Sequence, residues 1–273
     1  GGTVDFGGGD LTSVGSSDIF VAKLTSAGSH VWSQRFGALS LMGEAGNGLV
    51  VDPSGNVIVM GVFINTIDLG GGVLASIGSI DTYLAKLSSS GTHMWSKSFG
   101  GTNATTYGSG LVVDASLGVI LTGTFDGTVD FGFGGLASAG LTDIFALKLS
   151  SSGSHVWSKR VGGASSEGGR AVAVDASNNV VLAGSFQGTV DFGGGPLTSA
   201  GIDDMYLVKL SSSGAFIWSR RFGDAESDRG TALAIDEVGS VLLGGSFRST
   251  VDSGAGVFTS AGASDGFLLK VAP

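Results

Sequence analysis

The chain has no cysteine, only 3 prolines and few charged residues. Charged side chains make up 14% of its 273 residues, against roughly 25% in ordinary globular domains. Without cysteine it has neither disulfides nor thiolate metal ligands, and its histidines lie a whole repeat apart, so no tetrahedral zinc pattern exists. The apolar runs are short and broken by Gly, Asp or Ser, well below the roughly 18 residues that cross a bilayer. We therefore predict no membrane insertion.

Basic residues are also scarce. The chain has 14 Lys and Arg against 23 Asp and Glu, for a net charge of −9. Phosphate binding needs a basic face, so a nucleic acid is not an expected partner. Apolar residues reach 42%, which is enough to build a core and argues against disorder. The 50 glycines do not recur at every third position, so collagen is excluded.

A repeat of about 61 residues runs through the chain. Its tryptophans lie 63, 62 and 61 residues apart. Residues 128–160 and 189–221 are identical at about 20 of 33 positions. Such self-similarity at a fixed period is typical of repeat architectures. The residues that keep the spacing are Trp32, Trp95, Trp157 and Trp218, with Lys23, Lys86, Lys148, Lys209 and Lys270, and Asp5, Asp68, Asp130, Asp191 and Asp252.

Each repeat predicts four strands, which we call A to D. In one repeat they cover residues 171–175, 180–186, 204–210 and 216–222, and the Gly-rich insert at 189–201 is expected to form a looped hairpin. The apolar runs span five to seven residues with turns of five or fewer, too short for helices of eleven or twelve residues. Val, Ile, Phe and Thr dominate them, as strands prefer.

The burial pattern of these strands indicates a propeller. Strands A to C are apolar on both faces, whereas strand D alternates, which is typical of a blade with one outer strand. Gly61, Gly123, Gly184 and Gly245 recur within strand B, where a missing side chain lets a neighbouring backbone approach or permits a bulge. We predict an all-β fold, a β-propeller of four-stranded antiparallel blades.

Longer motifs resemble a known family. The segments VDASNNVVLAGSF, DIFALKLSSSGSHVWSKRVGG and DMYLVKLSSSGAFIWSRRFG are similar to the bacterial SBBP family of β-propeller repeats, which combine a turn, a Gly-ended strand, an Asp-x-aromatic-x-x-Lys-Leu strand and a Gly-x-x-x-Trp-Ser strand. The resemblance covers nearly the whole chain. It implies a secreted or surface-exposed bacterial propeller of a family often described as seven-bladed, a count from which this chain departs.

The ends of the chain leave blades incomplete. The sequence opens inside an insert and closes after a fifth strand C, against four each of strands A, B and D. We predict a single propeller domain, 1–273, of five blades with incomplete terminal blades; four blades closed by the N-terminal strand D are the alternative. The surplus material indicates a processed or truncated part of a longer protein. The predicted fragments are 1–40, 41–101, 102–163, 164–223 and 224–273.

Recurring polar and aromatic residues are expected to be structural. His30, His93 and His155 occupy one repeat position, as surface residues of strand D, whereas a catalytic histidine is singular. The strand C lysine, such as Lys23, is costly to bury unless paired. Its expected partner is either the Asp that ends strand A or the Asp of the TVDF segment. The tryptophans are expected to pack on the next blade, with stacking on sugars as the alternative.

Specificity needs asymmetry, so the variable connections from strand D to strand A carry the candidate ligand-binding residues. These connections cover 38–46, 102–108, 164–169 and 224–230, and are expected on one face around a central channel. They hold no base and nucleophile pair, and the acidic Gly-rich segments lack the spacing of calcium loops. We predict no enzyme, no catalytic residue, no metal and no cofactor. The candidates are Glu44, Tyr107, Glu167, Glu226, Asp228 and Arg229.

Three functions follow as hypotheses. The first is a secreted or cell-surface structural or protein-interaction module, whose incomplete blades offer edges for a partner or for self-association. The second is a multivalent lectin with one glycan site per blade. The third is a hydrolase that uses channel-face carboxylates, Glu44, Glu167 and Asp228.

Overall fold

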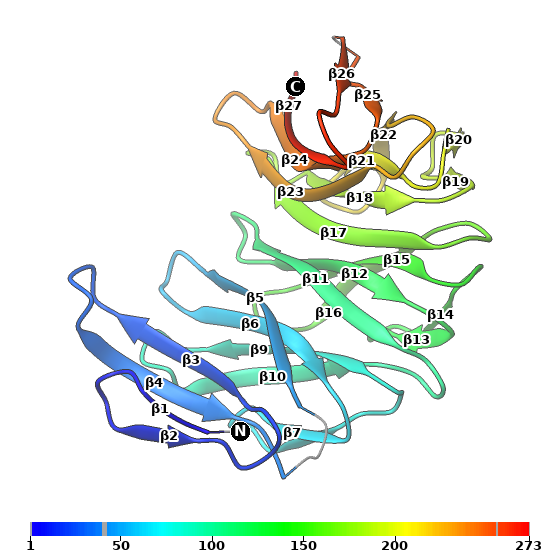
Figure 1. Ribbon diagram of the computed structural model, residues 1–273. Coiled ribbons are helices and arrows are strands. Elements are labelled where there is room, and N and C mark those ends of the chain that lie inside the picture. Colours follow the sequence, from blue (N-terminus) through cyan, green and yellow to red (C-terminus); the bar gives the residue numbers. More distant parts are fainter. Residues whose placement is uncertain (1, 40–42, 255, 273) are drawn as a thin grey trace. The chain divides into compact units, whose positions relative to one another are not determined.

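The structure is a computed structural model that describes residues 2–39, 43–254 and 256–272 (Figure 1). It divides into two compact units, Gly1–Gly108 and Ser109–Pro273, which are described separately. All regular elements in these ranges are β-strands. The described residues therefore contain no helix that could span a membrane.

The first unit contains one complete sheet and one strand pair. The sheet has the order β10-β9-β6-β5, and β3 pairs with β4. Short hairpins, β1–β2 and β7–β8, occupy the Gly-rich inserts. The strands are β1 (Thr3–Asp5), β2 (Asp10–Thr12), β3 (Ile19–Leu24), β4 (His30–Phe36), β5 (Ala45–Val51), β6 (Val57–Phe63), β7 (Thr66–Asp68), β8 (Val73–Ala75), β9 (Asp81–Leu87) and β10 (His93–Phe99).

The second unit continues the same order. Two four-stranded sheets, β11-β12-β15-β16 and β17-β18-β21-β22, are followed by a three-stranded sheet, β23-β24-β27. Strand β11 (Thr106–Val113) begins just before the unit boundary. The others are β12 (Val119–Phe125), β13 (Thr128–Asp130), β14 (Gly135–Ala137), β15 (Asp143–Leu149), β16 (His155–Val161), β17 (Glu167–Val174), β18 (Val180–Phe186), β19 (Thr189–Asp191), β20 (Pro196–Thr198), β21 (Asp204–Leu210), β22 (Phe216–Phe222), β23 (Arg229–Ile235), β24 (Val241–Phe247), β25 (Thr250–Asp252), β26 (Val257–Thr259) and β27 (Asp265–Val271).

The structure confirms strands B, C and D at their predicted bounds in β18, β21 and β22, and the predicted hairpin in β19–β20. Strand A was predicted too short, because β17 starts at Glu167 rather than at residue 171. The Gly168–Gly169 segment is extended and pairs with strand B, and a bulge between Gly169 and Ala171 restores the register. A Cβ at Gly184 would overlap the Gly168 carbonyl, so the missing side chain permits the predicted close approach.

Neighbouring sheets of the second unit share hydrophobic cores. One cluster joins Ile144 and Val161 of one sheet to Phe186 and Tyr206 of the next. A further cluster joins the opposite face of that second sheet, including Met205, to the three-stranded sheet. Strands B and C of that second sheet, β18 and β21, are therefore covered on both faces, as predicted. The same prediction for strand A is wrong, because β5 and β23 alternate with exposed residues. The repeated antiparallel sheets fit a β-propeller, while the blade number and ring closure stay predictions.

Aspartate side chains close most of the turns. Asp52 after strand A and Asp68 in the hairpin each accept hydrogen bonds from the backbone N–H groups two and four residues ahead. Asp81, the first residue of strand C, accepts one from the N–H group four residues earlier in the chain. Such Asx contacts favour turns over continued strands. The same bonds recur at Asp114, Asp175 and Asp236, at Asp5, Asp130 and Asp191, and at Asp18, Asp143, Asp204 and Asp265.

One turn carries backbone strain that a substitution should relieve. The third turn position after strand A has positive φ, and it is Gly55 or Gly239 in two repeats but Leu117 at φ 63°. A side chain there costs roughly 1–2 kcal/mol, partly offset by the greater unfolded-state freedom of glycine. We expect Leu117→Gly to raise the free energy of unfolding by about 0.5–1 kcal/mol in guanidinium titrations. Asn178→Gly, at φ 60°, is the control. It should gain less because Asn tolerates this region and because the change removes the hydrogen bond that the Ala115 N–H donates to Asn178 at 2.9 Å; equal or reversed gains would contradict the explanation.

Candidate functional site

The strand C lysines form ion pairs with the Asp that ends strand A. Lys86 lies 2.9 Å from Asp52 and Lys148 lies 2.7 Å from Asp114, with both carboxylates fully buried. The first of the two predicted partners is therefore correct. The pairs Lys209–Asp175 and Lys270–Asp236 repeat the contact at 2.9 and 2.7 Å.

The same aspartates serve the turn and the ion pair with different oxygens. Oδ1 of Asp52 accepts the turn N–H groups, and Oδ2 accepts from Lys86 and from the Asn56 amide. Burial opposes ionisation, but the hydrogen bonds from Lys86 and Asn56 outweigh it and lower the pKa of Asp52 to about 2. Among the described residues no aspartate pairs with Lys23, which donates to the Ser89 carbonyl at 2.9 Å. These lysines are committed to structure.

A second polar cluster joins strands C and D to the start of the next strand A. Asp143 Oδ2 accepts from Arg160 at 2.8 Å and from the Ala139 N–H at 2.9 Å. Glu167 Oε2 accepts from the Gly163 N–H at 2.9 Å. The remaining oxygens, Asp143 Oδ1 and Glu167 Oε1, are buried without a hydrogen-bond partner.

Two buried carboxyls beside one arginine favour retention of a proton. Burial raises the pKa of Glu167 to about 7, and the neighbouring Asp143 carboxylate adds to the effect against the opposing Gly163 hydrogen bond. A Cβ on Gly162 would overlap both carboxyl groups, which shows that they lie against the same point of the backbone. Like charges this close do not both ionise readily.

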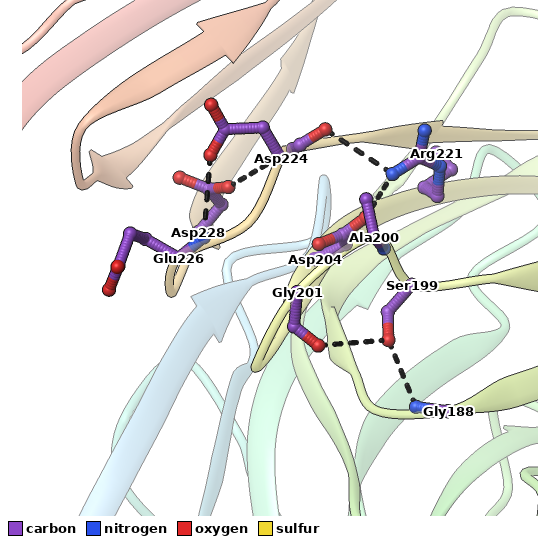
Figure 2. Close-up of polar contacts among 10 residues, drawn as sticks. Gly188, Ser199, Ala200, Gly201, Asp204, Arg221, Asp224, Glu226 and Asp228 are labelled. Carbon is purple, nitrogen blue, oxygen red and sulfur yellow. Dashed lines mark hydrogen bonds and ion pairs between the residues drawn. The ribbon is translucent and has the colours of Figure 1, made fainter.

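The same cluster recurs in the following repeat. Figure 2 shows Arg221 directed at the Asp204 carboxylate and Asp228 accepting a hydrogen bond from the Asp224 N–H. Asp228 is fully buried, and burial raises its pKa. A Cβ on Gly223 would approach both Asp204 and Asp228 to about 2.8 Å.

Comparison of the repeats shows that the strand D arginine and the buried acid at the start of the next strand A occur together. In the first unit Arg35 pairs with Asp18, and burial raises the pKa of the buried Glu44. The complete sheet of that unit lacks both members, with Ser98 in place of the arginine and Thr106 in place of the acid. The sequence analysis did not select Asp143 and Arg160. The simultaneous replacement of the arginine and the acid in one repeat could have indicated that these residues contact each other.

The predicted ligand-binding residues do not gather into one site within either unit. Glu44, Glu167 and Asp228 are buried, so in this conformation they do not face solvent. Tyr107 is exposed, and Glu226 is exposed on the connection shown in Figure 2. Arg229 is exposed but pairs with Asp203 at 2.8 Å. Residues 40–42 of the first predicted connection lie outside the described residues.

Trp32 and Trp157 contact the turn of the next repeat, as expected. The Trp32 indole N–H donates to the Ser89 carbonyl at 3.0 Å, and the ring lies against Gly91. Trp157 makes the same contacts with Ser212 and Gly214 in the second unit. The glycine leaves the space that the indole occupies. These rings are therefore used for packing between repeats.

The histidines were predicted as surface positions, but they are half-buried. His30 and His93 lie under the Gly-rich hairpin tips, where a Cβ on Gly8 or Gly71 would overlap the imidazole. Each ring contacts a serine hydroxyl of the same strand at 3.1 Å. Their role is structural. Within the described residues no group of three or more His, Asp or Glu is placed to hold a metal ion.

The fold and this site define a class of protein, an all-β repeat protein whose three- and four-stranded antiparallel sheets each contain an ion pair between strand C and the turn after strand A. No family model matches the chain. Over 130 residues it is 23% identical to a protein of Acanthamoeba polyphaga mimivirus that is described as an uncharacterized WD repeat-containing protein. The similar stretch covers 41% of this chain and 9% of the viral protein. WD repeats build propeller blades of four strands, so the similarity fits the repeated sheets seen here.

Proposed function

We propose that the chain is a non-enzymatic, propeller-like protein-interaction module, secreted or carried on a bacterial cell surface. Its buried lysines and aspartates are committed to ion pairs and turns, which supports a scaffold rather than a reaction centre. The name of the viral relative points the same way, because WD-repeat propellers present rigid surfaces to partners. Secretion and bacterial origin rest on the resemblance to SBBP repeats.

The observation that carries the proposal is the exposure of strand C at two sheet edges. In complete sheets strand C is interior, and β9 and β15 are buried throughout. Within the described residues β3 and β27 each have one edge without a neighbouring strand. Phe20 on β3 is 53% exposed and Leu268 on β27 is 73% exposed. Such edges recruit further strands from partner chains or from second copies.

Self-association through these edges is directly measurable. We expect the 27.1 kDa chain to sediment as larger, concentration-dependent species, and Leu268→Lys to shift it toward the monomer, since charge on an edge strand blocks pairing. Val238→Lys is the matched control, because Val238 is also 73% exposed but lies in a turn. A wild-type monomer at all concentrations, or equal effects of both variants, would rule out self-association at this edge.

A further inference from the structure

Two repeats of the second unit contain a buried layer of three aromatic rings. The central ring comes from the hairpin insert and lies between a ring from strand B and a ring from strand C. Phe131 lies 5.7 Å from Phe125 and 4.7 Å from Phe145 between ring centroids. The corresponding distances of Phe192 are 5.6 Å to Phe186 and 4.9 Å to Tyr206.

The last repeat keeps the outer rings but lacks the central one. Ser253 follows the strand β25 where Phe192 follows β19. Phe247 and Phe267 remain, with centroids 6.4 Å apart and planes at 72°. Leu69 fills the equivalent position in the first unit and is fully buried. Serine is therefore the one small residue among the five equivalent insert positions, which are otherwise Phe6, Leu69, Phe131 and Phe192.

A pocket of about 300 Å³ lies at this point. Six of its twelve lining residues occupy the repeat positions of residues that cluster with Phe192. That ring packs in a cluster with Ile144, Val161, Phe186, Val190, Leu197 and Tyr206. The pocket is lined at the equivalent repeat positions by Met205, Phe222, Phe247, Val251, Phe258 and Phe267.

We propose that this pocket binds the phenyl group of a small molecule. The chain itself places a phenyl ring in the same surroundings one repeat earlier, at Phe192. A smaller apolar cavity, of roughly 150 Å³, is enough to bind benzene. Contact with Phe247 and Phe267 favours an aromatic ring over a saturated ring of the same size, because edge and offset ring contacts add to area burial.

The pocket also selects by charge. Asp265 lines it and accepts a hydrogen bond from the Ala261 N–H at 2.7 Å. Asp143 and Asp204 at this repeat position pair with arginines, so a cationic group is a suitable partner for the Asp265 carboxylate. A neutral or cationic phenyl compound is therefore the expected ligand class, and an anionic one is disfavoured.

The experiment is a titration of the 273-residue chain with benzyl alcohol and benzylamine by NMR and calorimetry. We expect one site with a Kd of about 1 mM or tighter, several-fold weaker binding of cyclohexylmethanol, and weaker binding of benzoate. Ser253→Phe should abolish the binding and raise Tm by roughly 3–10 °C, since it buries a ring. Ser253→Ala is the matched control and should bind as the wild type does.

Each outcome decides the proposal. Undetectable binding of both phenyl compounds at 10-fold above roughly 1 mM would overturn it. So would unchanged binding to Ser253→Phe, because the ligand would then occupy another site. Equal affinity for cyclohexylmethanol would overturn the selection of an aromatic ring. A lower Tm for Ser253→Phe than for the wild type would show that the pocket does not have the shape of the site that holds the Phe192 ring.

Discussion

Replacing Lys86 by methionine is expected to destabilise the chain by about 3–5 kcal/mol, since the change leaves a buried carboxylate without its cation. The Lys86 and Asp52 side chains are 4% and 0% exposed, and they lie 2.9 Å apart. Methionine keeps most of the volume and the flexible stem, so the loss reports the charge rather than a cavity. Asp52 also closes the turn after strand A, so the variant loses the contact that connects this turn to strand C.

Lys270→Met is the matched control. Lys270 makes the same contact with Asp236 at 2.7 Å, but these side chains are 60% and 27% exposed. An ion pair open to solvent contributes about 0–1 kcal/mol. The measurement is guanidinium unfolding at pH 7, with 0.5 M salt as a second condition that screens the exposed pair more than the buried one. Similar losses for both variants would contradict the role of burial.

The repeat and its strands followed from the sequence because their signals are local. The apolar runs and Gly or Asp turns around β18, β21 and β22 define strands without information from distant residues. The lysine in strand C also required a partner, and the fixed spacing limited it to two aspartates. The start of β17 was missed because Gly168 and Gly169 have no apolar side chain to mark a strand.

The buried carboxyl cluster was beyond this reasoning because it joins residues across repeats. Glu167 was selected as a loop residue, open to a ligand, whereas it is 2% exposed. Its surroundings are built by Asp143 and Arg160 from the preceding repeat together with the Gly163 N–H. Sequence variation between the connections pointed to Glu167 as a distinctive residue, but only the packing shows that its carboxyl group faces inward.

Glu167→Gln is expected to remove a pH dependence of stability. The pKa of Glu167 is raised from 4.5 to about 7 on folding, so the folded chain holds a proton that the unfolded chain releases. This contribution is complete below about pH 4.5 and is lost as the pH rises through about 7. At about 1.4 kcal/mol per pKa unit, wild-type stability should fall by at most about 3.5 kcal/mol between pH 4.5 and 8.

Glutamine reproduces the protonated carboxyl, since its amide can donate to Asp143 while its oxygen accepts from Gly163. The variant should match the wild type near pH 5 and exceed it by about 2–3 kcal/mol at pH 8, as measured by guanidinium unfolding across this range. Glu226→Gln, on an exposed side chain, is the control and should follow the wild type.

Asp52 affects the pH dependence of stability with the opposite sign. Because its pKa is about 2, its contribution is complete above about pH 4 and is lost as the pH falls through 2. Stability should therefore be greatest near pH 4–5, between the two titrations. A constant difference between Glu167→Gln and the wild type from pH 5 to 8 would show that Glu167 does not take up a proton on folding.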